Sequence, residues 1–181
     1  NAVRAEYLSG EQDYPWIIGF SGGKDSTVVA QAVFEALLQV PPSKRTRPVH
    51  VVSNDTLVES PLIIAHLVKV QDALRDMADG LRLPVKVVTT RPSPDKTFWT
   101  LLIGKGYPSP NQMMRWCTDR LKIQPTSRYI LDHVSAHGAA IVILGVRSDE
   151  SDTRRQSIDR HKNLENSKLT PHSALLGAFI Y

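Results

Sequence analysis

Short apolar runs alternate with longer amphipathic segments along most of the chain. Four of the runs are rich in β-branched residues and predict strands at Trp16–Phe20, Val49–Ser53, Val85–Thr89 and Ala140–Val146. The first and the last of these are apolar at nearly every position. Such runs are typical of strands that are buried on both faces of a parallel sheet.

Between the strands, apolar positions recur every three or four residues, which indicates helices. We expect helices over Ser26–Leu38, from Pro61 to about Gly80, over Thr97–Ile103 and over Pro125–Ala136. The alternation of strands and helices predicts an α/β fold with a doubly wound, mostly parallel sheet. Ligands of such sheets bind beyond the carboxyl ends of the strands, so the polar loops there are the first places to search.

Length and composition indicate one domain over residues 1–181. Apolar residues make up 41% of the chain and charged residues 22%, which is compatible with a packed core. Without an apolar run near the ~18 residues of a membrane span, we expect no membrane partner. The formal net charge of +4 permits an anionic partner without requiring one. Because the chain starts at Asn1 and stops at Tyr181 after an apolar stretch, we expect a fragment of a longer chain.

The chain has a single cysteine, Cys117, which excludes a disulfide framework. A lone cysteine fits a reducing compartment, and we therefore expect a cytoplasmic location. Cys117 alone cannot hold a four-cysteine metal or iron–sulfur site.

The strongest chemical signal is the hexapeptide Ser21-Gly22-Gly23-Lys24-Asp25-Ser26, which we call the glycine loop. Its two glycines allow a tight turn and a close approach of the backbone to a ligand. The backbone N–H groups of the turn and of the following helix point outward together and form an anion site. Lys24 adds a positive charge, and the two serines add hydroxyl groups. Asp25 could cap the helix, orient Lys24 or hold a divalent ion, and the sequence leaves these roles open.

The glycine loop resembles the SGGxDS loop of the PP-loop ATP pyrophosphatases, which adenylate a substrate and release pyrophosphate. Within that superfamily the chain is similar to the phosphoadenylyl-sulfate-reductase-like branch, and most similar to the DndC-type sulfurtransferases of bacterial DNA phosphorothioation. The matching stretches follow the family order and are Ile17–Ser26, Val51–Glu59, Leu102–Pro108, Arg115–Ile123 and Leu144–Arg154. The resemblance implies the adenine nucleotide alpha hydrolase-like fold with strand order 3-2-1-4.

The resemblance also implies a nucleotide site that extends beyond the glycine loop. Two further segments contribute to it, one after the second predicted strand (Ser53, Asp55, Thr56) and one after the fourth (Gly145, Arg147, Glu150, Arg154). By their chemistry alone, the first segment is equally compatible with an Asx-type turn. The second could be a solvated run of charges, although arginines are also suited to grip phosphates in a bidentate manner.

Cys117 is surrounded in sequence by the cations Arg115, Arg120 and Lys122, which would stabilise a thiolate. It is a candidate sulfur carrier or iron–sulfur ligand, whereas a buried structural role is the common fate of a lone cysteine. The related reductases carry a Cys-Cys pair at this place, but this chain has Thr118 at the second position. The resemblance implies that any [4Fe-4S] cluster would be completed by residues outside this chain.

The function implied is ATP-dependent activation of the DNA backbone phosphate for sulfur incorporation, with ATP and Mg²⁺ as cofactors. Lys24, Asp25, Arg147 and Cys117 are the expected catalytic residues. The expected partners are DNA, a cysteine desulfurase as the source of sulfur, and other proteins of the DNA phosphorothioation system. The alternatives are a phosphoadenylyl-sulfate or adenylyl-sulfate reductase, a non-catalytic ATP-binding regulatory module, and an enzyme that thiolates tRNA.

Overall fold

The computed structural model describes residues 2–9, 13–145, 169–172 and 175–180, which form an α/β fold around one sheet. Its strands are β1 (Trp16–Gly19), β2 (Val49–Asn54), β3 (Val85–Thr90), β4 (Ala140–Ile143), β5 (Thr170–Pro171) and β6 (Ala178–Ile180). The order across the sheet is β3-β2-β1-β4-β6-β5. β5 runs antiparallel to β6, and the other neighbouring strands run parallel to each other. The doubly wound, mostly parallel sheet is therefore confirmed, and the order 3-2-1-4 is extended by β6 and β5.

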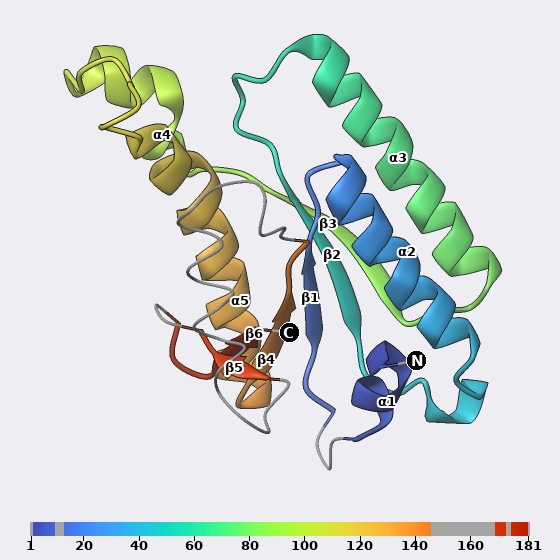
Figure 1. The fold of residues 1–181 in the computed structure, drawn as a ribbon. Coiled ribbons are helices and arrows are strands. Elements are labelled where there is room, and N and C mark those ends of the chain that lie inside the picture. The colour runs from blue at the N-terminus through green and yellow to red at the C-terminus, as the bar shows by residue number, and fades with distance from the viewer. Residues whose placement is uncertain (1, 10–12, 146–168, 173–174, 181) are drawn as a thin grey trace.

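Helices cover both faces of this sheet. They are α1 (Ala2–Ser9), α2 (Lys24–Leu38), α3 (Pro61–Gly80), α4 (Trp116–Thr118) and α5 (Gln124–His137), with the 3-10 turns η1 (Pro42–Lys44) and η2 (Pro94–Lys96) and the π-helical segments η3 (Thr100–Gly104) and η4 (Asp119–Ile123). α2 and α3 lie side by side on one face, and α5 lies on the other (Figure 1). The carboxyl ends of β1 and β2, followed by the starts of α2 and α3, meet at the upper edge in this view (Figure 1).

The apolar runs are continuous because both faces of each central strand are buried. In β1, Trp16 and Ile18 pack into the core beneath α2 and α3, whereas Ile17 packs into the core beneath α5. All three side chains are at most 1% exposed. Burying such a side chain fully contributes about 1.5–3 kcal/mol, so β1 is among the best anchored segments of the chain.

The remaining differences from the predicted elements lie in short segments. The helix predicted at Thr97–Ile103 is a π-helical turn over η3, because periodicity alone does not separate the helix types. The strand predicted at Ala140–Val146 ends at Ile143 in the structure, and Val146 lies outside the described residues. The structure also contains α1, α4 with η4, β5 and β6, which were not predicted. Each is shorter than the window over which its pattern can be recognised, about 11–18 residues for a helix and about 4–8 for a strand.

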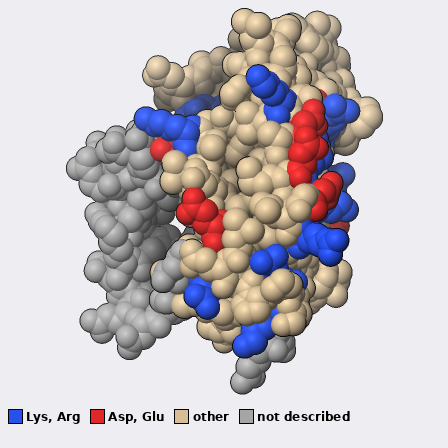
Figure 2. Space-filling view, turned by 90° about the vertical axis from the view of Figure 1, so that its right-hand side faces the viewer, with Lys and Arg blue, Asp and Glu red and all other residues tan. Residues whose placement is uncertain are grey.

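The side of the molecule on which α3 lies carries both signs of charge (Figure 2). Basic and acidic side chains are interspersed there, with no large patch of a single sign (Figure 2). No helix within the described ranges is long and apolar enough to cross a bilayer.

Candidate functional site

The glycine loop joins the carboxyl end of β1 to α2. The backbone N–H of Phe20 donates to the carbonyl of Val52 at 2.8 Å, which ties the end of β1 to β2. Gly22 then has a φ of +76°, which L side chains rarely adopt. A Cβ atom there would also lie 3.2 Å from Cδ1 of Leu67 in α3. The loop therefore requires glycine at this position for two independent reasons.

The two serines of the loop bond to the loop itself. The hydroxyl of Ser26 donates to the carbonyl of Gly23 at 2.9 Å and accepts the backbone N–H of Ser21 at 3.3 Å. The hydroxyl oxygens of Ser21 and Ser26 lie 3.2 Å apart. Ser26 is 7% exposed, whereas Ser21 is on the surface. The structure thus gives Ser26 a role in shaping the loop and leaves Ser21 at a place where a ligand can reach it.

The start of α2 presents its backbone amides without a side-chain cap. Gly23 is the N-cap residue, with extended dihedral angles, and no side-chain hydrogen bond closes this end of the helix. The positive end of a 15-residue helix dipole and its first N–H groups meet at the loop, as in known anion sites. Lys24 is exposed beside it, and Asp25 lies in the first turn. Because Gly23 is the N-cap, Asp25 does not cap the helix, and its other two possible roles stay predictions.

Gly145 is brought into contact with this first turn. A Cβ atom at Gly145 would lie 3.0 Å from the carbonyl carbon and oxygen of Asp25 and 3.2 Å from Cγ2 of Val29. The backbone that follows β4 therefore runs directly against α2, which only a residue without a side chain permits. Arg147, Glu150 and Arg154, the other predicted residues of this segment, lie outside the described residues.

The segment after β2 is held mainly by its own hydrogen bonds. Ser53 is completely buried, and within the described residues its hydroxyl has no hydrogen-bond partner. Asp55 accepts the N–H of Leu57 at 3.0 Å, which is an Asx-type turn, and pairs with Arg91 at 3.0 Å. Thr56 is 2% exposed and donates to Glu59 at 3.2 Å. The three residues thus lie at the predicted edge of the sheet. In this structure Asp55 and Thr56 bond to neighbouring groups of the protein, and the hydroxyl of Ser53 is buried.

This edge is connected to η4 and α5 through Lys122 and through two residues that the sequence did not single out, Asn54 and Glu59. The side-chain amide of Asn54 donates to the carbonyl of Lys122 at 3.1 Å and to the hydroxyl of Thr126 at 2.7 Å. Nζ of Lys122 in turn lies 3.1 Å from Oε1 of Glu59. All three residues fall inside the stretches that resemble the PP-loop family, and this resemblance is the signal that the sequence offers for them. Their partners are some 60–70 residues away in sequence, so the pairing itself was not visible.

Cys117 lies in the short helix α4 and is half-buried. Its side chain and that of Arg115 line a surface hollow together with Pro110, Asn111, Gln112 and Thr118. The other two predicted cations near Cys117 are paired with carboxylates, Arg120 with Asp119 at 3.5 Å and Lys122 with Glu59 at 3.1 Å. Of the three, Arg115 is therefore the one that lines the same hollow as Cys117.

The described residues do not fit an iron–sulfur cluster on their own. They hold no group of three or more His, Cys, Asp or Glu side chains that could bind a metal ion. Cys117 can supply one thiolate, and a cluster needs about four such ligands. An iron–sulfur cluster therefore has no role in the chemistry that we assign to these residues. A nucleotide-bound Mg²⁺ is less demanding, because phosphates and water supply most of its ligands and Asp25 is a carboxylate within the loop.

Three imidazoles and one phenol form a group where α5 faces β2. We call it the imidazole cluster, and its members are His50 of β2 and Tyr129, His133 and His137 of α5. Nδ1 of His50 lies 2.6 Å from the hydroxyl of Tyr129, and the rings of His50 and His133 are 4.3 Å apart. Burial, with a further contribution from His133, lowers the pKa of His50 to about 4. Burial also raises the pKa of Tyr129, and which of the two groups donates in their hydrogen bond depends on the tautomer of His50. Burial likewise lowers the pKa of His133.

The fold and the glycine loop together define an α/β domain with a candidate anion site at the end of its first strand. The chain belongs to the family described as "Phosphoadenosine phosphosulfate reductase domain", whose sequence profile matches residues 15–169. This family comprises nucleotide-binding enzymes of sulfur chemistry. The resemblance to the reductase-like branch is thereby confirmed, whereas the closer resemblance to DndC-type sulfurtransferases stays a prediction.

Comparison with curated proteins finds no match for this chain. Among solved structures, it is similar to phosphoadenylyl-sulfate (PAPS) reductase from Candida auris in its phosphate complex. That likeness has 14% identity and a TM-score of 0.47, and it covers 98% of this chain and 70% of that one. It is also similar to a protein from the universal stress protein family from Burkholderia pseudomallei. There the identity is 11% and the TM-score 0.38, with 85% of this chain and 93% of that one covered.

Proposed function

We propose that the chain is an ATP pyrophosphatase that adenylates a phosphate of the DNA backbone and so prepares it for sulfur incorporation. The observation that carries this proposal is the glycine loop. It combines a turn that only Gly22 can make with an uncapped 15-residue helix and an exposed Lys24. Such an arrangement suits the β- and γ-phosphates of a nucleotide better than a neutral ligand.

In the adenylation step, a non-bridging oxygen of the DNA phosphate attacks the α-phosphorus of ATP. The bond between the α-phosphorus and the oxygen that bridges to the β-phosphate breaks, and pyrophosphate leaves with the electron pair. Negative charge grows on the leaving group, and the amides at the start of α2 and the ammonium of Lys24 are positioned to stabilise it. We assign Arg147 to the α-phosphate on the resemblance alone.

In the second step, the outer sulfur of a persulfide on Cys117 attacks the activated DNA phosphorus and displaces AMP, which forms a P–S–S–Cys link. An external thiol reductant then attacks the Cys117 sulfur and breaks the S–S bond, so that the phosphorothioate leaves with the electron pair and the thiols are oxidised to a disulfide. A cysteine desulfurase is the proposed source of sulfur, in a reducing cytoplasm. Cys117 is the one cysteine available to carry that sulfur within this chain, and it lines a surface hollow together with Arg115. This assignment keeps the two steps on different residues, so they can be tested separately.

The choice of DNA as the acceptor is supported by sequence stretches outside the glycine loop. Val51–Glu59, Arg115–Ile123 and Leu144–Arg154 resemble the DndC-type sulfurtransferases. Thr118 after Cys117 departs from the Cys-Cys pair of the related reductases. A tRNA acceptor would use the same chemistry, and the two acceptors are compared directly by offering each to the same enzyme.

A second candidate function is the reduction of a nucleotide sulfate, and the family match over residues 15–169 favours it. In that reaction the thiolate of Cys117 would attack the sulfur of the sulfonucleotide, and the nucleotide would leave. A thiol reductant would then release sulfite from the enzyme. Release of sulfite from phosphoadenylyl sulfate, with no pyrophosphate from ATP plus DNA, would rank this candidate first.

The decisive experiment measures pyrophosphate release and transfer of the α-labelled adenylate to DNA by the full-length protein. We expect Lys24→Ala to lower the rate of release by about 10²–10³-fold, as for the loss of one group that stabilises developing charge. Lys44→Ala is the matched control, because Lys44 is an exposed lysine in η1, beyond the far end of α2. A normal rate in the Lys24→Ala variant would remove the glycine loop from the mechanism.

A further inference from the structure

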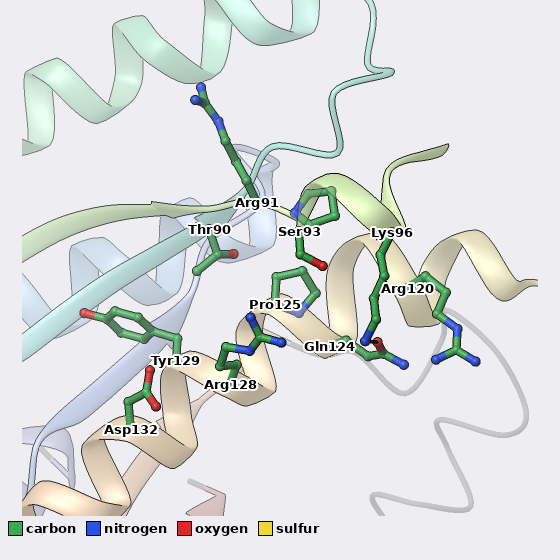
Figure 3. Close-up of a pocket in the computed structure, with 11 residues that line it drawn as sticks. Thr90, Arg91, Ser93, Lys96, Arg120, Gln124, Pro125, Arg128, Tyr129 and Asp132 are labelled. Atoms are coloured by element: carbon green, nitrogen blue, oxygen red, sulfur yellow. Dashed lines mark hydrogen bonds between the residues drawn. The ribbon is translucent and has the colours of Figure 1, made fainter. Parts of the chain in front are cut away.

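A second cationic site lies two strands away from the glycine loop. A pocket of about 230 Å³ opens between the carboxyl end of β3 and the helix formed by η4 and α5. Its lining is Thr90, Arg91, Pro92, Ser93, Lys96, Arg120, Gln124, Pro125, Arg128, Tyr129 and Asp132, and we call it the basic pocket. Figure 3 shows that the labelled lining residues come from the end of β3 and the segment after it on one side and from the helix on the other.

Positive charge dominates this lining. It contains the four cations Arg91, Lys96, Arg120 and Arg128 and the single acid Asp132. The side on which α3 lies differs, since both signs are interspersed there (Figure 2). A concave surface with one sign of charge concentrates counter-ions of the opposite sign, so the natural ligand of this pocket is an anion.

Two of the four cations are already partly neutralised from outside the pocket. Arg91 pairs with Asp55 at 3.0 Å, and Figure 3 shows it extending away from the other side chains. Arg120 lies 3.5 Å from Asp119. The other two, Lys96 and Arg128, are therefore the cations most available to a ligand.

Lys96 is held in place by a short chain of hydrogen bonds. Its Nζ donates to Oε1 of Gln124 at 3.2 Å, and Nε2 of Gln124 donates to Asp119 at 3.0 Å. An ammonium group bonded to a neutral amide keeps its full charge and has two donors left. The pocket thus presents Lys96 in a defined position.

Arg128 lies exposed on the helix, and Figure 3 shows its guanidinium beside Pro125, on the pocket side. Within the described residues it has neither an ion pair nor a hydrogen bond. Arg120, Gln124 and Arg128 follow one another at intervals of four, and all three line the pocket. At 1.5 Å per residue, Arg120 and Arg128 are on the order of 12 Å apart along the helix axis. This stripe begins inside the π-helical segment η4, and such segments are frequent at functional sites.

We propose that the basic pocket binds the sugar–phosphate backbone of a nucleic-acid strand, with Lys96 and Arg128 on its phosphates. Lys96 is bonded to Gln124, which lies one helical turn, or about 6 Å along the axis, from Arg128, so consecutive phosphates of a strand can contact the two cations separately. Side chains of this kind position a strand without reading its sequence. The choice of a nucleic-acid strand as the ligand rests on the proposed function, in which DNA is the acceptor. The presence of a cationic pocket does not depend on that function.

The test measures the binding of a short fluorescent single-stranded DNA to the full-length protein as a function of salt, without nucleotide. Arg128→Gln should weaken binding about tenfold and lower the slope of log K against log salt by about 0.7, the value of one lost phosphate contact on a single strand. Arg128→Lys should keep most of the affinity, because a point charge still meets a phosphate. Because Arg128 is exposed, its replacement should leave the melting temperature unchanged.

Lys69→Gln is the matched control, since it removes one positive charge from an exposed position on α3, on the opposite face of the sheet. An unchanged affinity and salt slope in Arg128→Gln would overturn the proposal, and so would an equal loss in Lys69→Gln. A competition experiment offers a third outcome that would overturn the proposal. If inorganic phosphate displaces the labelled strand as effectively, per phosphate group, as an unlabelled strand does, the pocket holds single phosphates.

The binding test and the pyrophosphate test can fail separately. If Arg128→Gln loses the strand while Lys24→Ala releases pyrophosphate normally, the basic pocket stands and the proposed function falls. If Lys24→Ala is inactive while Arg128→Gln binds the strand like the unmodified protein, the proposed function stands and the basic pocket falls. ATP affinity should be unchanged in Arg128→Gln, because the pocket lies away from the glycine loop.

Discussion

The glycine loop and the basic pocket both suit negatively charged ligands, but they are built in opposite ways. The loop offers backbone amides and small side chains, and its shape is set by Gly22 and by the bonds of Ser26. The pocket offers long flexible side chains, of which Arg128 is exposed. A backbone site is rigid and costs little ordering upon binding, whereas a side-chain site pays rotamer entropy for each contact.

This difference predicts how each region responds to substitution. The loop follows directly from the buried strand β1, and α3 lies close enough to Gly22 that an added Cβ would be 3.2 Å from Leu67. A change there disturbs the fold and the ligand site together. In the pocket, a surface arginine can be replaced with an expected effect on stability within about 0.5 kcal/mol. Function and stability should therefore be coupled at the loop and separable at the pocket.

The largest effect is expected for Gly22→Ala. The strained φ of +76° and the contact with Leu67 should cost about 1–3 kcal/mol, and relief of that strain would turn the loop out of its binding shape. Nucleotide affinity should fall roughly 10- to 100-fold, as that free energy implies, and titration calorimetry measures it. Gly106→Ala is the control, because Gly106 also has a positive φ, of +66°, but no atom lies within 4 Å of its Cβ position. Equal loss of affinity in both variants would contradict the coupling at the loop.

A smaller effect on binding, with a clear effect on stability, is expected for Gly145→Ala. Its Cβ would press on the backbone of Asp25 at 3.0 Å, and overpacking of this kind costs about 1–3 kcal/mol. Urea unfolding should show this loss. Gly104→Ala, whose nearest contact would be 3.9 Å away, should be neutral or slightly stabilising. If Gly145→Ala unfolds at the same urea concentration as the unmodified protein, the residues that follow β4 do not pack as closely against α2 as we describe.

The smallest effect near neutrality is a dependence of stability on pH that comes from the imidazole cluster beneath α5. Because the pKa of His50 falls from 6.5 to about 4 on folding, the unfolded chain binds more protons between these values. The stabilisation is therefore complete above about pH 6.5 and is lost as the pH falls towards 4. At pH 5.5 the loss should be roughly 1 kcal/mol.

The acid sensitivity should distinguish the two faces of the sheet. At pH 5.5, the protection of backbone amides against hydrogen exchange, relative to the unfolded chain at the same pH, should fall in α5 before it falls in α2. The reason is that three members of the cluster belong to α5. The His50→Gln variant, whose amide can either donate a hydrogen bond to Tyr129 or accept one from it, should have a flatter pH profile of stability. An identical profile in both proteins would show that His50 does not carry the effect.

The sequence was sufficient for features that depend on local pattern. β1 and β2 were found because burial on both faces leaves a continuous apolar run, and the glycine loop because Gly22 and Gly23 follow such a run directly. Contacts between distant segments were out of reach. Asp55 pairs with Arg91, 36 residues away, and Asn54 reaches Thr126, 72 residues away.

The basic pocket was missed for a related reason. Its helix stripe could have been read from the interval of four between Arg120, Gln124 and Arg128. The same three residues equally suit a solvated helix face, and Lys96 arrives from a different segment. The fold brings these charges to one place, where Lys96 of η2 bonds to Gln124 of α5.

The most direct test of the account is a crystal structure of the full-length protein with a non-hydrolysable ATP analogue. The account predicts that the β- and γ-phosphates lie on the backbone amides of Gly22, Gly23 and Lys24, with the ammonium of Lys24 against them. A polyphosphate bound in the basic pocket or elsewhere, with the glycine loop empty, would contradict it.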